Sequence, residues 1–81
     1  MPGTKTRITK HAKERMQKYG LSEVSVMDTL QKPDILIDGH SGRKIAQRKL
    51  NDYVLRVIFE KRSDDIVVIT VYKARRKRYE V

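Results

Sequence analysis

Residues Ile66–Tyr79 carry the sequence IVVITVYKARRKRY, in which a β-branched run passes directly into a basic cluster. An apolar run of this length is typical of a strand that is buried on both faces, and such strands usually lie in the middle of a sheet. From Lys73 to Arg78 every residue except Ala74 is positively charged. The strand would fix these charges to the most rigid part of the fold, which favours a role in binding a polyanion.

The charge of the whole chain has the same bias. The 81 residues carry a formal net charge of +9, with twelve basic and five acidic side chains in residues 43–81 against seven and five in residues 1–42. Clustered positive charge is typical of nucleic-acid-binding proteins, and the alternative is a basic protein whose charges are only solvated. The length predicts one domain over residues 1–81, with residues 1–7 as a flexible arm and residues 74–81 as a basic tail.

Several classes of protein are disfavoured by composition. The chain has no cysteine, which excludes disulfides and thiolate metal sites. Its two histidines, His11 and His40, are far apart and have no carboxylate cluster at ligand spacing, so we expect neither a metal nor another cofactor. No apolar run approaches the roughly 18 residues of a membrane span, and the N-terminus lacks the apolar core of a secretory signal. We therefore expect a cytoplasmic protein without a membrane partner.

Two helices are expected in the first half of the chain. Thr9 as N-cap and Gly20 as C-terminal cap predict a helix over residues 10–19. Ser22 as N-cap predicts a second helix, which Pro33 ends by residue 31 or 32. Helical spacing selects the residues expected to face the core: Ile8, Ala12, Met16, Tyr19, Val24, Val26, Met27 and Leu30.

The second half of the chain has the pattern of strands. A short strand is expected near Ile35–Asp38, and it could also pair between subunits to give a homodimer. Three longer strands are expected at residues 43–50, 53–60 and 66–73. Short turns between them imply antiparallel neighbours. The prediction is an α+β domain with two N-terminal helices packed on a three- to four-stranded antiparallel meander sheet.

Strand alternation divides the longer strands into two faces. One face is expected to carry apolar residues beneath the helices: Leu55, Val57, Phe59, Val67, Ile69 and Val71. Arg56, Thr70 and Tyr72 would then share the opposite face. Lys44 and Arg48 could join them, whereas a one-residue slip would exchange these two for Ile45 and Gln47. We expect the basic run from Lys73 to continue this polar face.

One chemistry suits such a surface without a metal: cleavage of RNA by attack of a ribose 2′-hydroxyl on its own phosphate. This reaction needs a proton acceptor, a proton donor and cations near the phosphate oxygens. His11 and Arg15 form an i, i+4 pair on the first helix and are of the required types. His40 lies in a glycine-flanked loop and is expected to be an exposed loop residue.

Further basic and aromatic residues are candidates for binding nucleic acid: Lys44, Arg48, Lys73, Arg75, Arg76, Lys77, Arg78 and Tyr79. The same surface could bind phosphates without catalysis, as a non-catalytic RNA- or DNA-binding module. A third alternative is a small adaptor whose basic end docks on an acidic protein. Composition does not separate these alternatives.

Four segments together resemble a known family. The opening ITKHAKERMQKYGLSEVSV, the strands RKIAQRKL and YVLRVIFE, and the final Thr70-Val71-Tyr72 followed by basic residues resemble the domain of unknown function 4258 family. That family is similar to the BrnT-type and RelE-type toxins, which have a small fold of helices on a meander sheet and cleave RNA without metal.

The resemblance carries functional expectations. It implies catalytic roles for five residues: His11, Arg15, Arg56, Thr70 and Tyr72. It also implies RNA as the substrate, with ribosome-associated RNA included, and a small antitoxin protein as a partner.

Overall fold

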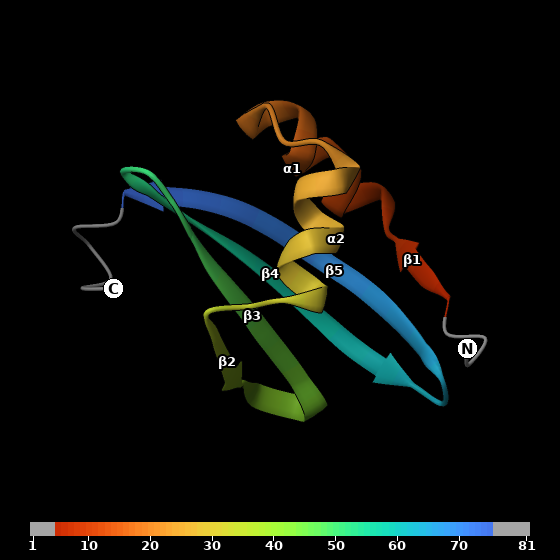
Figure 1. The fold of residues 1–81 in the computed structure, drawn as a ribbon. Coiled ribbons are helices and arrows are strands. Elements are labelled where there is room, and N and C mark those ends of the chain that lie inside the picture. The colour runs from red at the N-terminus through yellow and green to blue at the C-terminus, as the bar shows by residue number, and fades with distance from the viewer. Residues whose placement is uncertain (1–4, 76–81) are drawn as a thin grey trace.

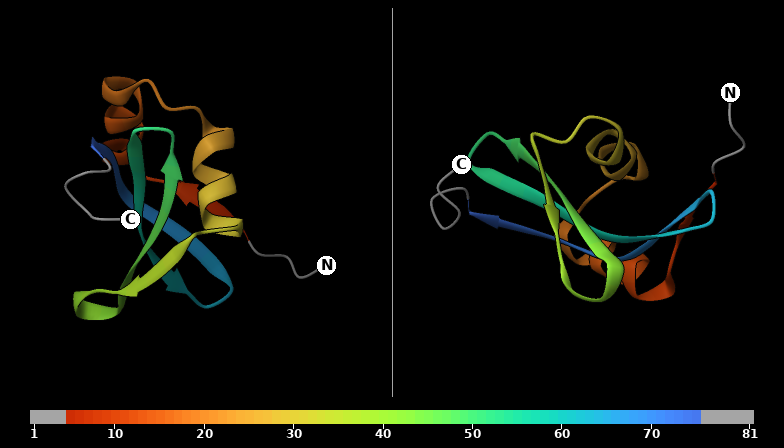
Figure 2. Two further views of the ribbon diagram at one scale, coloured as in Figure 1. Left: turned by 60° about the vertical axis from the view of Figure 1, so that its left-hand side comes forward. Right: turned by 90° about the horizontal axis from the view of Figure 1, so that it is seen from below.

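The computed structural model describes residues 5–75, which form one mixed sheet and two α-helices (Figure 1). The elements in chain order are β1 (Thr6–Ile8), α1 (Lys10–Tyr19), α2 (Glu23–Gln31), β2 (Ile35–Asp38), the 3₁₀ turn η1 (His40–Gly42), β3 (Arg43–Leu50), β4 (Tyr53–Arg62) and β5 (Asp65–Arg75). The strand order is β1-β5-β4-β3-β2. Figure 2 shows that the long strands β3, β4 and β5 form a strongly twisted sheet, and β1 lies beyond β5.

The fold is α+β, as expected, but the sheet is larger than expected and is not wholly antiparallel. Strands β2 to β5 form the expected antiparallel meander, whereas β1 adds a fifth strand that runs parallel to β5. Residues 6 and 7, which were expected to belong to a flexible arm, therefore lie in the sheet. The Ile66 amide donates to the Lys5 carbonyl at 2.8 Å, and the Thr9 amide donates to the Val68 carbonyl at 3.2 Å.

Both helices begin and end where their capping residues predict. The Thr9 hydroxyl accepts a hydrogen bond from the Ala12 amide at 3.2 Å, and Gly20 ends α1 in the left-handed conformation with φ 67°. The Ser22 hydroxyl accepts from the Ser25 amide at 3.2 Å at the start of α2. Neither helix of the described chain is long and apolar enough to cross a membrane.

The buried face of α2 differs from the expected one. Val24 is 68% exposed, whereas Thr29 is fully buried. A hydroxyl is tolerated there because Thr29 Oγ1 donates to the Ser25 carbonyl at 2.8 Å, within the same helix. The prediction from helical spacing that Val24 faces the core is therefore wrong.

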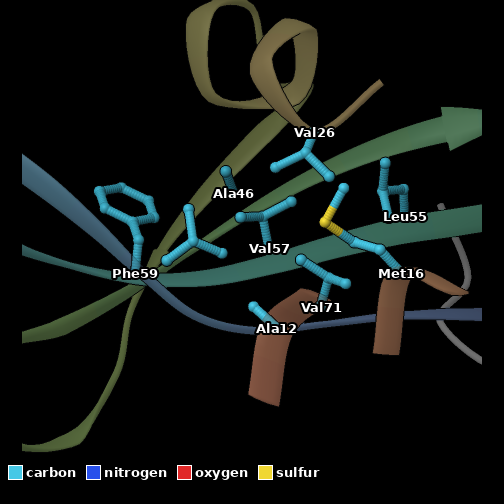
Figure 3. Packing of buried hydrophobic residues seen from close by; sticks show 9 residues of the cluster. Ala12, Met16, Val26, Ala46, Leu55, Val57, Phe59 and Val71 are labelled. Atoms are coloured by element: carbon cyan, nitrogen blue, oxygen red, sulfur yellow. The ribbon is translucent and has the colours of Figure 1, made fainter. Parts of the chain in front are cut away.

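The hydrophobic core lies between the helices and one face of the sheet (Figure 3). Helix α1 packs on β5, and α2 packs on β3 and β4. Met16 of α1 and Val26 of α2 point toward Leu55, Val57 and Val71 of the long strands. Both helices thus cover the same side of the sheet, and we call the opposite side the outer face.

Candidate functional site

A β-bulge at Ile69 decides which residues of β5 reach the outer face. The turn at the other end of the hairpin pairs Arg62 with Asp65, and an uninterrupted register from there would pair Arg56 with Val71. The register shifts by one residue between Ile58 and Phe59, so Arg56 pairs with Tyr72 instead. Bulges often occur next to functional sites because they re-aim side chains in this way.

The bulge also corrects the expected apolar set of β5. Val67, Ile69 and Val71 were expected to face the core together. Val71 does so, but before the bulge the alternation is reversed, and Val68 lies in the core cluster in place of Val67. The expectation failed because strict alternation cannot anticipate an inserted residue.

The outer face brings together three of the predicted site residues. Arg56 and Tyr72 are direct partners across β4 and β5, and Thr70 pairs with Ile58 on the same face. Arg56 Nη1 donates a hydrogen bond to Tyr72 Oη at 2.6 Å, and the guanidinium carbon lies 5.5 Å from the centre of the tyrosine ring. All three side chains are half-buried. The prediction that Arg56, Thr70 and Tyr72 share a face is confirmed.

On β3 the structure has the second of the two registers that the sequence left open. Lys44 pairs with Phe59 and Arg48 with Leu55, so both basic residues lie on the core side rather than on the outer face. The residue opposite Arg56 is Gln47, which is 3% exposed. The register corresponds to the one-residue slip, and it places an amide rather than a second cation beside the Arg56–Tyr72 pair.

The prediction that the basic run continues the polar face beyond Tyr72 is wrong for Lys73 and Arg75. β5 extends to Arg75, so alternation continues, and Lys73 and Arg75 pair with Leu55 and Tyr53 on the core side. Lys73 Nζ lies 4.9 Å from the centre of the Tyr53 ring. The remaining residues expected to bind nucleic acid lie outside the described residues: Arg76, Lys77, Arg78 and Tyr79.

The start of α1 is tied to the bulge. Thr9 Oγ1 donates to the carbonyl of Ile69 at 3.0 Å while it accepts from the first turn of α1. Ile69 directly precedes Thr70. The N-terminal turn of α1, which carries His11, is therefore fixed beside the bulged segment of β5.

The two flanks of α1 have different surroundings. Lys13 and Gln17 line a hollow together with Leu21 and with Glu23 at the start of α2. His11 and Arg15 lie on the opposite flank of α1, because they are roughly 160–240° away around a helix with 3.6 residues per turn.

His11 and Arg15 differ in burial. His11 is exposed, whereas the Arg15 side chain is half-buried. Arg15 Nε is shielded from solvent and has no hydrogen-bond acceptor within residues 5–75. Both residues lie on α1, which packs on the core side of the sheet, so they do not share the outer face with Arg56, Thr70 and Tyr72.

A group of charged residues lies further along the outer face, and residue patterns did not single it out. Glu60 Oε2 accepts from Arg43 Nε at 3.0 Å, and Glu60 Oε1 accepts from Arg62 Nη2 at 2.9 Å. The hydrogen bonds from Arg62, which has the larger effect, and from Arg43 lower the pKa of the Glu60 carboxyl below its usual 4.5. Alternation along β4 was the available signal, because Glu60 has the same parity as Arg56.

The described residues contain no group of three or more histidine, cysteine, aspartate or glutamate side chains arranged to hold a metal ion. The polar groups around the Arg56–Tyr72 pair are a guanidinium, a phenol, a hydroxyl and an amide. Such groups can bind and orient a phosphate, and they can transfer protons when a substrate is in place.

Comparison with family models gives a match over residues 8–73 to the family described as Domain of unknown function (DUF4258). The chain belongs to this family. The match spans both helices, strands β2 to β4 and β5 as far as Lys73, so His11, Arg15, Arg56, Thr70 and Tyr72 all lie inside the DUF4258 region. Comparisons with curated proteins and with solved structures give no significant match.

Proposed function

We propose that this DUF4258 protein is a metal-independent endoribonuclease of the RelE and BrnT toxin type. The observation that carries the proposal is the Arg56–Tyr72 pair, with 2.6 Å between Nη1 and Oη, on the same face as Thr70. A cation and a proton-transfer group held at this distance are what phosphate chemistry without a metal requires. The tether from Thr9 to Ile69 supports a contribution from the start of α1.

In the proposed reaction the ribose 2′-oxygen attacks the adjacent phosphorus and the bond from phosphorus to the 5′-oxygen breaks. His11 and Tyr72 are the proton-transfer groups: one takes the proton of the 2′-hydroxyl and the other gives a proton to the leaving 5′-oxygen. The phosphate binds at the edge of β5 beyond Val68, where the pairing with β1 ends, so that α1 and the outer face both reach it. Arg15 and Arg56 bind the non-bridging oxygens, where negative charge increases, and Thr70 donates to the same phosphate. The products are a 2′,3′-cyclic phosphate and a 5′-hydroxyl.

The test is incubation of the purified protein with RNA in EDTA, alone and with ribosomes, followed by identification of the new ends. Cleavage should leave cyclic phosphate ends, and His11→Ala should lower the rate by about 10²–10⁴-fold. Lys10→Ala is the matched control, because Lys10 is exposed in the same helical turn and carries no proposed role. An intact RNA under all these conditions would remove the proposal.

The second candidate is a non-catalytic RNA- or DNA-binding module. It is favoured by the distribution of Lys44, Arg48, Lys73 and Arg75 on the other side of the sheet from the Arg56–Tyr72 pair. Cations spread over two faces suit sequence-independent contacts to phosphates more than one focused site. Salt-sensitive binding of RNA without cleavage would support this module.

The toxin assignment adds a cytoplasmic location and a protein partner, a small acidic antitoxin that neutralises the basic surface. Co-purification of the tagged chain with the product of an adjacent small reading frame tests the partner. Suppression of RNA cleavage by that product would support the pairing. If this product leaves the rate of RNA cleavage unchanged, the proposed pairing is contradicted.

A further inference from the structure

The outer face has a hollow of about 360 Å³ beyond the Arg56–Tyr72 pair, at the end of β4 and the start of β3. Its polar walls include His40, Arg43 and Glu60, and its apolar lining includes Ile45 and Ile58. This volume is at the lower end of the range for small-ligand sites, about 300–1,000 Å³. An apolar surface with a few polar groups at its rim is also the usual composition of such sites.

The floor of the hollow suits a flat ring. Ile45 and Ile58 are direct partners across β3 and β4, and both are half-buried. Their side chains offer an apolar platform, while the exposed His40 stands in the loop at the wall. Unstacked bases of single-stranded RNA are bound in this way, against apolar, aromatic or imidazole side chains.

The loop that carries His40 has a defined shape. Ser41 and Gly42 both have left-handed backbones, with φ 58° and φ 76°. The Gly39 amide donates to the Arg43 carbonyl at 2.7 Å, which closes the loop. The loop is also close-packed, because a Cβ at Gly39 would lie 3.1 Å from the Arg43 carbonyl oxygen. His40 is thus presented from a closed turn.

The polar rim presents one hydrogen-bond donor, the Arg43 guanidinium, beside two acceptors, the carboxylate oxygens of Glu60. Arg43 donates to Glu60 Oε2, and Glu60 Oε1 accepts from two nitrogens of Arg62, at 2.9 and 3.1 Å. A carboxylate has about four lone-pair sites. The Arg62 side chain is 65% exposed, so a ligand can replace one of its two bonds at little cost.

Among the four RNA bases, guanine has the matching edge. Its O6 acceptor lies beside two adjacent donors, N1–H and the N2 amino group, which complement Arg43 and the two oxygens of Glu60. Adenine and cytosine offer a single amino donor on this edge, and uracil places carbonyl oxygens on both sides of its one N–H. A carboxylate therefore favours guanine.

We propose that the hollow bounded by His40, Arg43, Ile45, Ile58 and Glu60 is a guanine subsite for single-stranded RNA. This inference rests on the proposed function, because the ligand is a base of the RNA strand that crosses the Arg56–Tyr72 pair. Glu60 is four residues from Arg56 on the same face of β4, about 13 Å at the rise of a strand. The subsite would select guanine near the cleaved linkage.

The test measures binding separately from cleavage. Four pentanucleotides, UUGUU, UUAUU, UUCUU and UUUUU, are made with 2′-O-methyl riboses that cannot attack the phosphate, and their dissociation constants are measured by fluorescence anisotropy. Wild-type protein should bind UUGUU about tenfold or more tightly than the others, as expected when two hydrogen bonds recognise the edge of one base. Glu60→Gln should abolish this preference. Asp52→Asn, the same charge change on an exposed turn residue, should keep it.

A second variant guards against disturbance of the Arg43–Glu60–Arg62 contacts. His40→Ala changes an exposed loop side chain and should weaken binding of UUGUU by about fivefold or more through loss of stacking. Equal binding of all four oligonucleotides by the wild type would overturn the guanine subsite, and so would a preference for another base. Cleavage of ordinary RNA without any guanine preference would leave the proposed nuclease standing, whereas guanine preference without cleavage would leave only the subsite.

Discussion

At the scale of single residues, the bond from Arg56 Nη1 to Tyr72 Oη joins the two central strands of the proposed site at 2.6 Å. Arg56→Gln removes the cation and keeps a polar side chain on β4. We expect the rate of RNA cleavage in EDTA to fall by about 10²–10³-fold, since one group that stabilises developing charge is lost. Lys61→Gln is the control, because Lys61 is exposed and carries the same charge five residues further along β4. An equal effect of both variants would mean that only net charge matters.

Glu60 gives a prediction about stability and pH. The hydrogen bonds from Arg62 and Arg43 lower the pKa of its carboxyl in the folded protein below 4.5. The unfolded chain therefore binds the proton more tightly, so the contribution of these bonds is present above pH 4.5 and is lost as the pH falls through the folded-state pKa. The difference in Tm between wild type and Glu60→Gln should shrink on acidification below pH 4.5. A difference that grows on acidification would contradict the assigned direction of the shift.

At the scale of elements, Thr9 links α1 to β5 through the carbonyl of Ile69. Thr9→Val keeps the shape and removes both the cap and this bond. We expect a loss of about 1–2 kcal/mol in the free energy of unfolding, together with a lower cleavage rate, because His11 is no longer held beside the bulge. Chemical denaturation and cleavage kinetics measure the two effects.

The control is the cap of the other helix. Ser22→Ala removes the N-cap of α2, which does not contact β5 through its cap. We expect a comparable loss of about 1 kcal/mol with an unchanged cleavage rate of the folded protein. If both variants lower the rate equally, the tether has no special role in positioning α1.

The register of β3 against β4 can be predicted from the sequence of the turn between them. The two-residue turn at Asn51 and Asp52 pairs Leu50 with Tyr53, and Asn51 has φ 54°, as tight hairpin turns require. Counting back from that turn pairs Gln47 with Arg56. The turn could therefore have decided between the two registers that the sequence left open for Lys44 and Arg48.

Other features could not be predicted from local pattern. The bulge at Ile69 lies within a continuous β-branched run, and no turn residue or glycine marks it. Strand β1 has three residues and is formed by pairing with residues 66–68, which are distant in the chain. Both features depend on contacts between remote segments, and local periodicity carries no information about such contacts.

At the scale of the whole molecule, basic residues lie on both sides of the sheet. The double variant Lys44→Ala and Arg48→Ala changes only the core side. If these residues bind RNA phosphates, removal of two contacts should reduce the salt slope of single-strand binding by about 1.4. The rate of the bound complex should stay unchanged, as measured under single-turnover conditions. A rate loss as large as that of Arg56→Gln would mean that the reaction takes place on the core side of the sheet, which contradicts the proposal.

The site residues were predicted with mixed success for physical reasons. Arg56, Thr70 and Tyr72 were grouped correctly because each alternates with an apolar neighbour along its strand. The group of Arg43, Glu60 and Arg62 was missed because a surface carboxylate between arginines resembles any solvated charge pattern. Their catalytic and binding roles remain predictions for the experiments described above.

The most direct measurement compares two RNA oligonucleotides that differ at one linkage. One has a 2′-hydroxyl at the cleaved position and the other has a 2′-deoxyribose there, and both are incubated with the wild-type protein in EDTA. The account predicts cleavage of the first alone, with a 2′,3′-cyclic phosphate and a 5′-hydroxyl as the new ends. Equal cleavage of both, or binding of both without cleavage, would contradict it.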